Sequence, residues 1–169
     1  RLDLPSEKTS LLKPLGIQQL VLITFNNDLA KLKADTFIQE ILHTTLKAKR
    51  IAIGENFRFG KNREGDASTL KRIGESLGIE VNVVPIIKDT VGRMSSSRIR
   101  SALSTGDLKT ATRLLGRSYS FQGIVIKGKG IGKQLGWPTA NLAINGRKFL
   151  PGLGVYASWA KEVNGIKIR

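Results

Sequence analysis

The glycine-rich stretch GKGIGKQLGWPTANL, residues 128–142, holds the residue types best suited to binding a phosphate chain. Gly128, Gly130 and Gly132 have no side chain, so their backbone N–H groups can approach an anion closely. Lys133 follows and can add a positive charge beside the same anion. We expect a phosphate-binding loop here. The alternative, from spacing alone, is an ordinary glycine-rich β-turn.

Two polar residues close this stretch and could bind a metal ion. Pro138 stiffens the chain just before Thr139 and Asn141, which are separated by a single residue. In an extended segment, residues i and i+2 point to the same face. A hydroxyl and an amide carbonyl are hard oxygen ligands of the kind that suits Mg²⁺ bridging phosphates. The sequence therefore predicts a magnesium site, with an asparagine cap of a turn as the alternative.

The segment GIVIKGKG, residues 123–130, overlaps the start of this stretch. It fits the first seven positions of the P-loop pattern but not the last. Gly130 stands where a P-loop carries the Ser or Thr that binds magnesium. The interior IVIK is typical of a strand rather than of a loop wrapped around phosphates. We therefore reject a P-loop.

A second candidate site begins with three consecutive serines at the start of a helical pattern. Hydroxyls and free N–H groups at a helix N-terminus can bind a triphosphate, and the helix dipole favours its charge. Arg98 and Arg100 bring permanent positive charge to the end where attack on phosphorus concentrates negative charge. We expect catalytic roles for Ser96, Arg98 and Arg100, and nucleotide binding by Ser95 and Ser97. The alternative is a serine N-cap in a solvated loop.

The segment GENFRFG, residues 54–60, is a third candidate. Asn56 can hydrogen-bond a nucleotide or flavin, and Phe59 can form an apolar wall beside a ring system. Because Phe57 and Phe59 alternate with polar residues, the alternative is a strand end with one buried face.

Alternating strands and helices must position these residues. Apolar runs predict strands, helical spacing predicts helices, and serine, aspartate and glycine mark helix ends. Strands are expected over residues 18–25, 49–57 and 79–87, and helices over 6–16, 35–47, 68–78, 95–106 and 107–116. We take Ser6, Ser95–Ser97 and Asp107 as helix caps. Strands and helices of these lengths predict βαβ units with a parallel sheet.

After Gly116 the pattern changes to glycine-rich, β-prone runs without helical spacing. This pattern is typical of antiparallel strands in a small barrel or sandwich. We therefore expect two domains, 1–116 and 117–169.

The composition narrows the function classes. With 28 Lys and Arg against 13 Asp and Glu, the formal charge is +15, which attracts polyanions, either nucleic acid or nucleotides. The absence of cysteine excludes disulfides and thiolate metal sites, and the one histidine, His43, is expected to pack in its helix. We found neither a membrane-spanning run nor a secretion signal, so a cytoplasmic location and no membrane partner are expected.

The glycine-rich stretch and the later LPGLGVYA resemble the start of the riboflavin kinase (flavokinase) barrel. The resemblance implies a six-stranded barrel that transfers the γ-phosphoryl group of ATP to the 5′-hydroxyl of riboflavin. It implies that Thr139 and Asn141 bind Mg²⁺ with the nucleotide, and that residues 128–133 cover the phosphates.

IGENFRFGKNREGD and MSSSRIRSAL resemble the FMN adenylyltransferase module of the bacterial bifunctional flavokinase/FAD synthetase. That family reads Ser-Ser-Thr/Ser-x-x-Arg where this chain has Ser95–Ser97 and Arg100. The resemblance implies a nucleotidyltransferase fold with a Rossmann-like parallel sheet. It places the family's His-x-Gly-His signature upstream of Arg1 and the kinase base beyond Arg169, so we expect a fragment cut at both ends.

Together the two resemblances imply flavin cofactor synthesis, with ATP, riboflavin and FMN as substrates, Mg²⁺ as cofactor and no nucleic-acid partner. One alternative is a basic nucleic-acid-binding protein with a small β-barrel. Another is an adenylyltransferase whose barrel has lost kinase activity.

Overall fold

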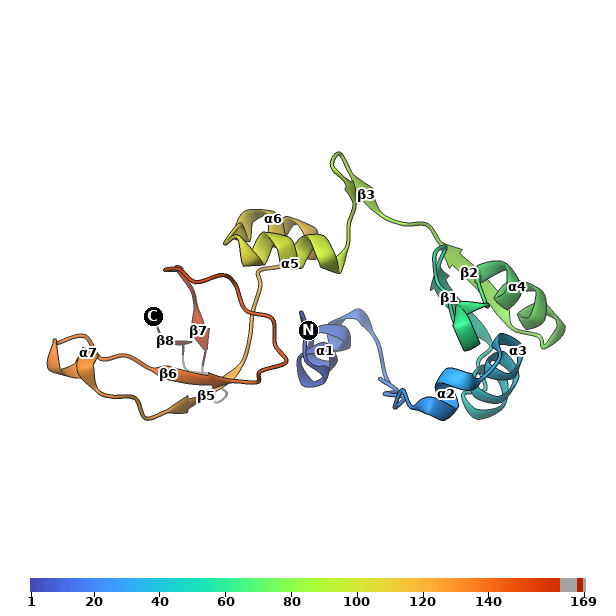
Figure 1. Ribbon diagram of the computed structural model, residues 1–169, viewed down its shortest axis with the longest axis horizontal. Helices are drawn as coiled ribbons and strands as arrows, with labels where there is room; N and C mark the ends of the chain where they lie inside the picture. The colour runs from blue at the N-terminus through green and yellow to red at the C-terminus, as the bar shows by residue number, and fades with distance from the viewer. Residues whose placement is uncertain (162–166, 169) are drawn as a thin grey trace. The chain divides into compact units, whose positions relative to one another are not determined.

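The computed structural model describes residues 1–161 and 167–168, which fall into two compact units (Figure 1). The first unit combines residues 1–18 with residues 95–169, and the second spans residues 19–94.

The second unit is built on a parallel pair of strands joined through a helix. Strand β1 (Arg50–Gly54) pairs with β2 (Glu80–Val84) in register from Arg50 opposite Glu80 to Gly54 opposite Val84. Helix α4 (Ala67–Ser76) lies between them in the chain, so the predicted βαβ unit is confirmed. A Cβ on Gly74 would lie 3.0 Å from Cγ2 of Val81, so this glycine lets α4 approach β2 closely.

One continuous helical segment packs under this pair. It consists of α3 (Ala34–Thr36) and the π-helix η2 (Phe37–Thr45), which confirms the helix expected here. The buried core of the unit is formed by Ala34, Ile38, Phe59 and Leu70. His43 is half-buried on η2. The remaining elements are α2 (Asn27–Lys31), η3 (Lys61–Arg63) and the antiparallel pair β3 (Lys88–Asp89) and β4 (Gly92–Arg93).

The strand expected over residues 18–25 is wrong. These residues form neither a helix nor a strand, and side chains such as Leu22 and Phe25 are exposed. A strand exists only through hydrogen bonds to a neighbour. Among the described residues, β1 is paired only with β2, and no segment pairs with residues 18–25.

The helical part of the first unit contains four elements. They are α1 (Pro5–Leu12), η1 (Lys13–Leu15), α5 (Ser96–Ser104) and α6 (Leu108–Leu115). The expected caps Ser95 and Asp107 are confirmed, since each side chain accepts a backbone N–H of its helix. Ser6 is not a cap: α1 begins at Pro5, and the Glu7 carboxylate accepts the Leu4 N–H at 2.7 Å instead.

The remainder of the first unit is antiparallel, as expected. Strand β5 (Gly123–Ile126) pairs with β6 (Asn141–Ile144), and β7 (Ala160–Lys161) pairs with β8 (Lys167–Ile168). These are two separate pairs, and no barrel is closed within residues 1–161 and 167–168. Helix α7 (Ile131–Gln134) lies in the glycine-rich loop, where no helix was expected. The expected domain 117–169 includes residues 162–166 and 169, which lie outside the described part.

No helix in the described part of the chain combines the length and the apolar character needed to cross a bilayer.

Candidate functional site

The glycine-rich loop joins β5 to β6 and packs directly on the two predicted metal ligands. A Cβ on Gly128 would lie 2.1 Å from the side-chain nitrogen of Asn141, and one on Gly132 would lie 3.2 Å from the hydroxyl oxygen of Thr139. A side chain at Gly128 would occupy space that the Asn141 side chain now holds, and one at Gly132 would meet the carbonyl oxygen of Trp137 and then the Thr139 side chain. The structure therefore brings the two glycines and the two polar residues together at one end of the β5–β6 ribbon.

Hydrogen bonds within the loop fix its shape. The N–H of Trp137 donates to the carbonyl of Gly132 at 2.7 Å, and α7 starts from Gly130 in the left-handed conformation at φ 73°. Lys133 on α7 and Pro138 after it are both exposed. The loop is thus one helical turn closed back on itself, and it leaves the Lys133 charge free to meet a ligand from solvent.

The side-chain oxygens of Thr139 and Asn141 are of the chemical type that binds magnesium. Thr139 offers a hydroxyl and Asn141 an amide, both next to the backbone of the loop. No cluster of three or more His, Cys, Asp or Glu side chains that could hold a metal occurs within the residues that the structure describes.

The three serines start α5. Ser95 is the N-cap, with its hydroxyl oxygen 3.4 Å from the N–H of Arg98, while Ser96 and Ser97 occupy the first turn and are exposed. The first N–H groups of a helix have no carbonyl partner within it. The predicted N-cap role is thus observed for Ser95, and the two following serines face solvent, where an anion can reach them.

The two arginines lie at this helix start. A side-chain nitrogen of Arg100 is 3.5 Å from the hydroxyl of Ser97, a donor–acceptor distance at the limit of hydrogen bonding. Arg98 is half-buried and already has an interaction partner. Ile99, between them, is buried and holds the turn against the protein. The positive charge that the sequence predicted beside the serines is therefore present.

Asn56 contacts a residue that the sequence analysis did not single out. With its amide oriented so that the oxygen faces Arg93, that oxygen accepts from both terminal nitrogens of Arg93, at 2.9 and 3.1 Å. Arg93 belongs to β4, two residues before Ser95 in the chain. Its position in the sequence beside the serines was the only signal that could have pointed to it.

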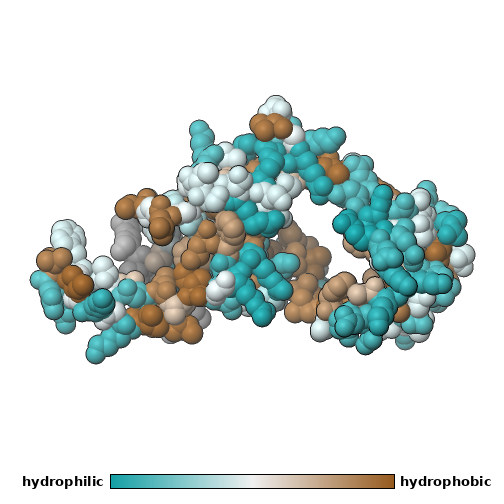
Figure 2. Space-filling view, viewed as in Figure 1, coloured by the Kyte–Doolittle hydropathy of each residue, from teal (hydrophilic) through white to brown (hydrophobic). Residues whose placement is uncertain are grey.

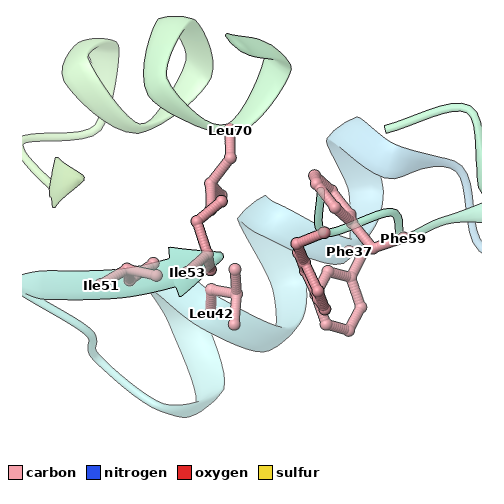
Figure 3. Close-up of a pocket in the computed structure, with 7 residues that line it drawn as sticks. Phe37, Leu42, Ile51, Ile53, Phe59 and Leu70 are labelled. Atoms are coloured by element: carbon pink, nitrogen blue, oxygen red, sulfur yellow. The ribbon is translucent and has the colours of Figure 1, made fainter. Parts of the chain in front are cut away.

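Phe59 forms one wall of an apolar cavity in the second unit (Figure 3). The cavity has a volume of about 120 Å³ and is lined by Phe37, Leu42, Ile51, Ile53, Phe57, Phe59 and Leu70. Phe59 is buried, and its ring lies 5.5 Å from that of Phe57 at an interplanar angle of 19°. Phe59 is thus a buried core residue that also lines this cavity, and its contact with a ring system stays a prediction.

Comparison with known proteins decides the family. The FAD synthetase family profile matches residues 1–98, more than half of the chain, and the riboflavin kinase profile matches residues 115–167. The chain belongs to the FAD synthetase family. The FAD synthetase match contains Asn56, Phe59, the three serines and Arg98, and it ends two residues before Arg100. The riboflavin kinase match contains the whole glycine-rich loop with Thr139 and Asn141.

Curated relatives carry both activities in their names. The chain is 38% identical over 159 residues to the bifunctional riboflavin kinase/FMN adenylyltransferase of Buchnera aphidicola from Schizaphis graminum. It is 34% identical over 157 residues to the enzyme of that name from Escherichia coli K12. Each alignment covers 93% of this chain and 50% of the relative, so the chain spans about half the length of these relatives.

A solved structure has a similar fold. A crystal structure from Streptococcus pneumoniae, described as a macrolide-efflux protein, matches with a TM-score of 0.80 and 33% identity. The match covers 97% of this chain and 58% of that one.

Proposed function

We propose that this FAD synthetase family chain carries parts of two ATP-dependent sites of flavin cofactor synthesis. One site would phosphorylate riboflavin to FMN at the glycine-rich loop, and the other would adenylylate FMN to FAD at the start of α5. The names of the curated relatives and the two separate family matches support this proposal.

At the kinase site, the supporting observation is the position of the Asn141 side chain where a Cβ on Gly128 would lie and of the Thr139 side chain close to that of Gly132. Thr139 and Asn141 would hold Mg²⁺, which when bound would neutralise charge on the phosphate chain of ATP. The loop backbone and Lys133 would bind the phosphates and orient the γ-phosphoryl group toward the riboflavin 5′-hydroxyl. The 5′-oxygen forms a bond to the γ-phosphorus and the bond from that phosphorus to the β–γ bridging oxygen breaks. The hydroxyl proton is released to solvent, so FMN, ADP and a proton are formed. Positioning and charge neutralisation are the main contributions of a protein to such a transfer.

At the adenylyltransferase site, the supporting observation is the position of Arg100 beside Ser97 at the first turn of α5. Ser95, Ser96 and Ser97 would bind the ATP phosphates through hydroxyl and N–H groups. Arg98 and Arg100 would stabilise the charge that develops when the FMN phosphate attacks the α-phosphorus. The bond from that phosphorus to the α–β bridging oxygen breaks, and pyrophosphate leaves.

Two residues of the second unit are also proposed to bind nucleotide or flavin. Asn56 would donate or accept hydrogen bonds from the nucleotide or flavin, and the wall at Phe59 would contact the apolar ring edge. The proposal also includes a Rossmann-like sheet in residues 1–116, a barrel from residue 117 on, and a cytoplasmic location. ATP, riboflavin and FMN would be the small-molecule partners.

Reciprocal substitutions in the full-length protein test the proposal. Thr139→Ala is expected to lower riboflavin phosphorylation about 100-fold and to leave FMN adenylylation within about twofold, because only one site loses a ligand. Ser96→Ala combined with Arg100→Met is expected to do the reverse.

Each variant is the folding control for the other. Undiminished riboflavin phosphorylation by Thr139→Ala would overturn the magnesium assignment. FAD formation by a full-length wild-type protein that never phosphorylates riboflavin would instead show that the loop is a binding module without kinase activity.

A further inference from the structure

A buried ionic cluster in the first unit has no part in either proposed site. It consists of Asp3, Glu7, Arg117, Tyr119 and Lys148. The ammonium group of Lys148 lies 2.8 Å from the Glu7 carboxylate and donates to the carbonyl of Leu2 at 2.6 Å. The Lys148 side chain is fully buried, and that of Glu7 is only 8% exposed. Such a pair is retained only when its geometry compensates the cost of removing both charges from water.

The rest of the ionic cluster surrounds this pair. Arg117 binds Asp3 at 2.8 Å, and Asp3 lies 3.8 Å from the Lys148 ammonium. That ammonium also lies 4.7 Å from the centre of the Tyr119 ring, within cation–π distance. The Tyr119 hydroxyl is 2.5 Å from the carbonyl of Phe149 and 3.1 Å from that of Leu2.

The ionic cluster lies at the base of the ribbon formed by β5 and β6. Arg117 and Tyr119 precede β5, and Lys148 follows β6, so the cluster holds both chain ends at the base of the ribbon. The ribbon register places Gly123 opposite Ile144 at this base and Ile126 opposite Asn141 at the far end.

The far end of the ribbon is the candidate magnesium site. A two-stranded ribbon alone is marginally stable in water. Figure 2 shows apolar side chains on the surface over β5 and β6, and Ile124 and Val125 are largely exposed. Within the described residues no third strand pairs with the ribbon. The attachment of the ribbon to the rest of the first unit therefore depends on the contacts at its base.

The turn that follows β6 connects this strand to the ionic cluster. The N–H of Lys148 donates to the carbonyl of Asn145 at 2.8 Å, and the N–H of Arg147 donates to the side-chain oxygen of Asn145 at 2.9 Å. Further along, the N–H of Gly152 donates to the carbonyl of Leu103 at 2.9 Å. The segment leaving β6 is thus fixed to α1 through Lys148 and to the end of α5 through Gly152.

We propose that Lys148 is a positioning residue for the Thr139–Asn141 site, acting through its buried contacts with Glu7 and Leu2 at the base of the β5–β6 ribbon. This inference rests on the proposed kinase function. It assigns to residues 2–7, within the FAD synthetase match, a role in the site that lies within the riboflavin kinase match.

Hydrogen exchange of the full chain tests the positioning without relying on activity. Lys148→Met alone leaves the Glu7 carboxylate buried without its partner, so unfolding could obscure the result. Glu7→Gln with Lys148→Met removes both charges and preserves the volumes. In this double variant, the amides of β5 and β6 are expected to exchange about tenfold faster, while those of α5 and α6 keep their rates. Lys109→Met, an exposed lysine on α6, is the control.

Kinetics then tests the effect on the site. In the double variant, the Mg²⁺ concentration for half-maximal riboflavin phosphorylation is expected to rise about tenfold, as when an outer partner of a metal ligand is lost. FMN adenylylation by the same preparation is expected to stay within about twofold, which a general loss of folding would not allow.

The outcomes separate the two proposals. Unchanged exchange of the β5–β6 amides, or an unchanged Mg²⁺ requirement, would overturn the positioning role of Lys148 while leaving the kinase function intact. A full-length wild-type protein without riboflavin kinase activity would overturn the proposed function and with it this role, whatever the exchange rates show.

Discussion

Gly128 and Gly132 make the closest approaches in the glycine-rich loop, and their lack of a side chain can be tested directly. Gly128→Ala would place a methyl group 2.1 Å from the Asn141 amide nitrogen, so that side chain must move. A displacement of about 1 Å at a reacting site can lower the rate about 100-fold. We expect riboflavin phosphorylation to fall about 100-fold, as measured by FMN formation.

Gly146→Ala is the matched control. A Cβ at Gly146 meets no atom within 4 Å, and its φ lies outside the left-handed range. Its activity should equal that of the wild type. If Gly128→Ala were also as active as the wild type, Asn141 would have no role at the site.

Tyr119 reports on the ionic cluster through its ionisation. Burial, and then the charges of Asp3 and Glu7, raise the pKa of Tyr119 to about 12, while Arg117 opposes the shift and the Lys148 ammonium faces the ring. The folded-state pKa is above the ordinary value of about 10, so the folded state favours the neutral phenol. The stability this contributes is complete below about pH 10 and is lost as pH rises towards 12.

An absorbance titration of tyrosinate measures this shift. Tyr119→Phe should remove the component that titrates near pH 12. A titration without a component above about pH 10 would contradict the raised pKa of the half-buried Tyr119.

Individual residues were predictable where the determining interaction is local. The caps Ser95 and Asp107 bond to N–H groups three residues further along, so the sequence contains the whole motif. The prediction of Ser6 as a helix cap was wrong because the Glu7 side chain accepts the N–H of Leu4 at the same helix start. Arg93 was missed because its contact with Asn56 joins residues 37 positions apart, which no local pattern encodes.

At the scale of elements, α4 depends on one charged cap. The Asp66 carboxylate accepts from the Thr69 N–H at 2.9 Å and from the hydroxyls of Ser68 and Thr69. These bonds, led by that of the Thr69 N–H, lower the pKa of Asp66 to about 2 from 3.8. The folded pKa lies below the unfolded one, so the stability contributed is complete above about pH 5 and is lost as pH falls towards 2.

Thermal melts followed by circular dichroism between pH 7 and acid pH test this cap. Asp66→Asn retains a capping oxygen but not the charge, so its melting temperature should fall less than that of the wild type on acidification. Glu75→Gln on the same helix is the control, because that side chain lies in the last turn rather than at the cap. Equal acid sensitivity of wild type and Asp66→Asn would exclude Asp66 as a source of the pH dependence.

Helices were more predictable than strands in this chain for a physical reason. A helix satisfies its backbone internally, so the spacing of apolar residues in 34–45 and in α4 was enough to place both. A strand needs a partner, and residues 18–25 have the apolar content of a strand without a paired neighbour in the described chain. The spacing of apolar residues did not distinguish the π-helical form of η2 from an α-helix.

At the scale of the whole molecule, the formal charge of +15 is compatible with two function classes, an enzyme with nucleotide substrates and a nucleic-acid-binding protein. The two family matches, 1–98 and 115–167, divide the chain at a place close to the predicted boundary at Arg117, which remains a prediction. Neither the charge nor the division distinguishes a nucleotide substrate from a polynucleotide ligand. Ionic strength does, because the two ligands release very different numbers of counterions.

Binding measured against salt therefore discriminates the enzyme from a nucleic-acid-binding protein. A protein that neutralises six or more phosphates of an oligonucleotide loses about a thousandfold or more in affinity between 50 and 200 mM salt. We expect Mg²⁺–ATP to bind more tightly than a single-stranded oligonucleotide at about 150 mM salt, since specific phosphate contacts at short range are screened far less than a diffuse field. Lys133→Met should weaken ATP and leave the oligonucleotide nearly unaffected, whereas Lys71→Met, an exposed lysine on α4, should change neither. Oligonucleotide binding that outcompetes ATP at that salt concentration would favour the nucleic-acid-binding alternative.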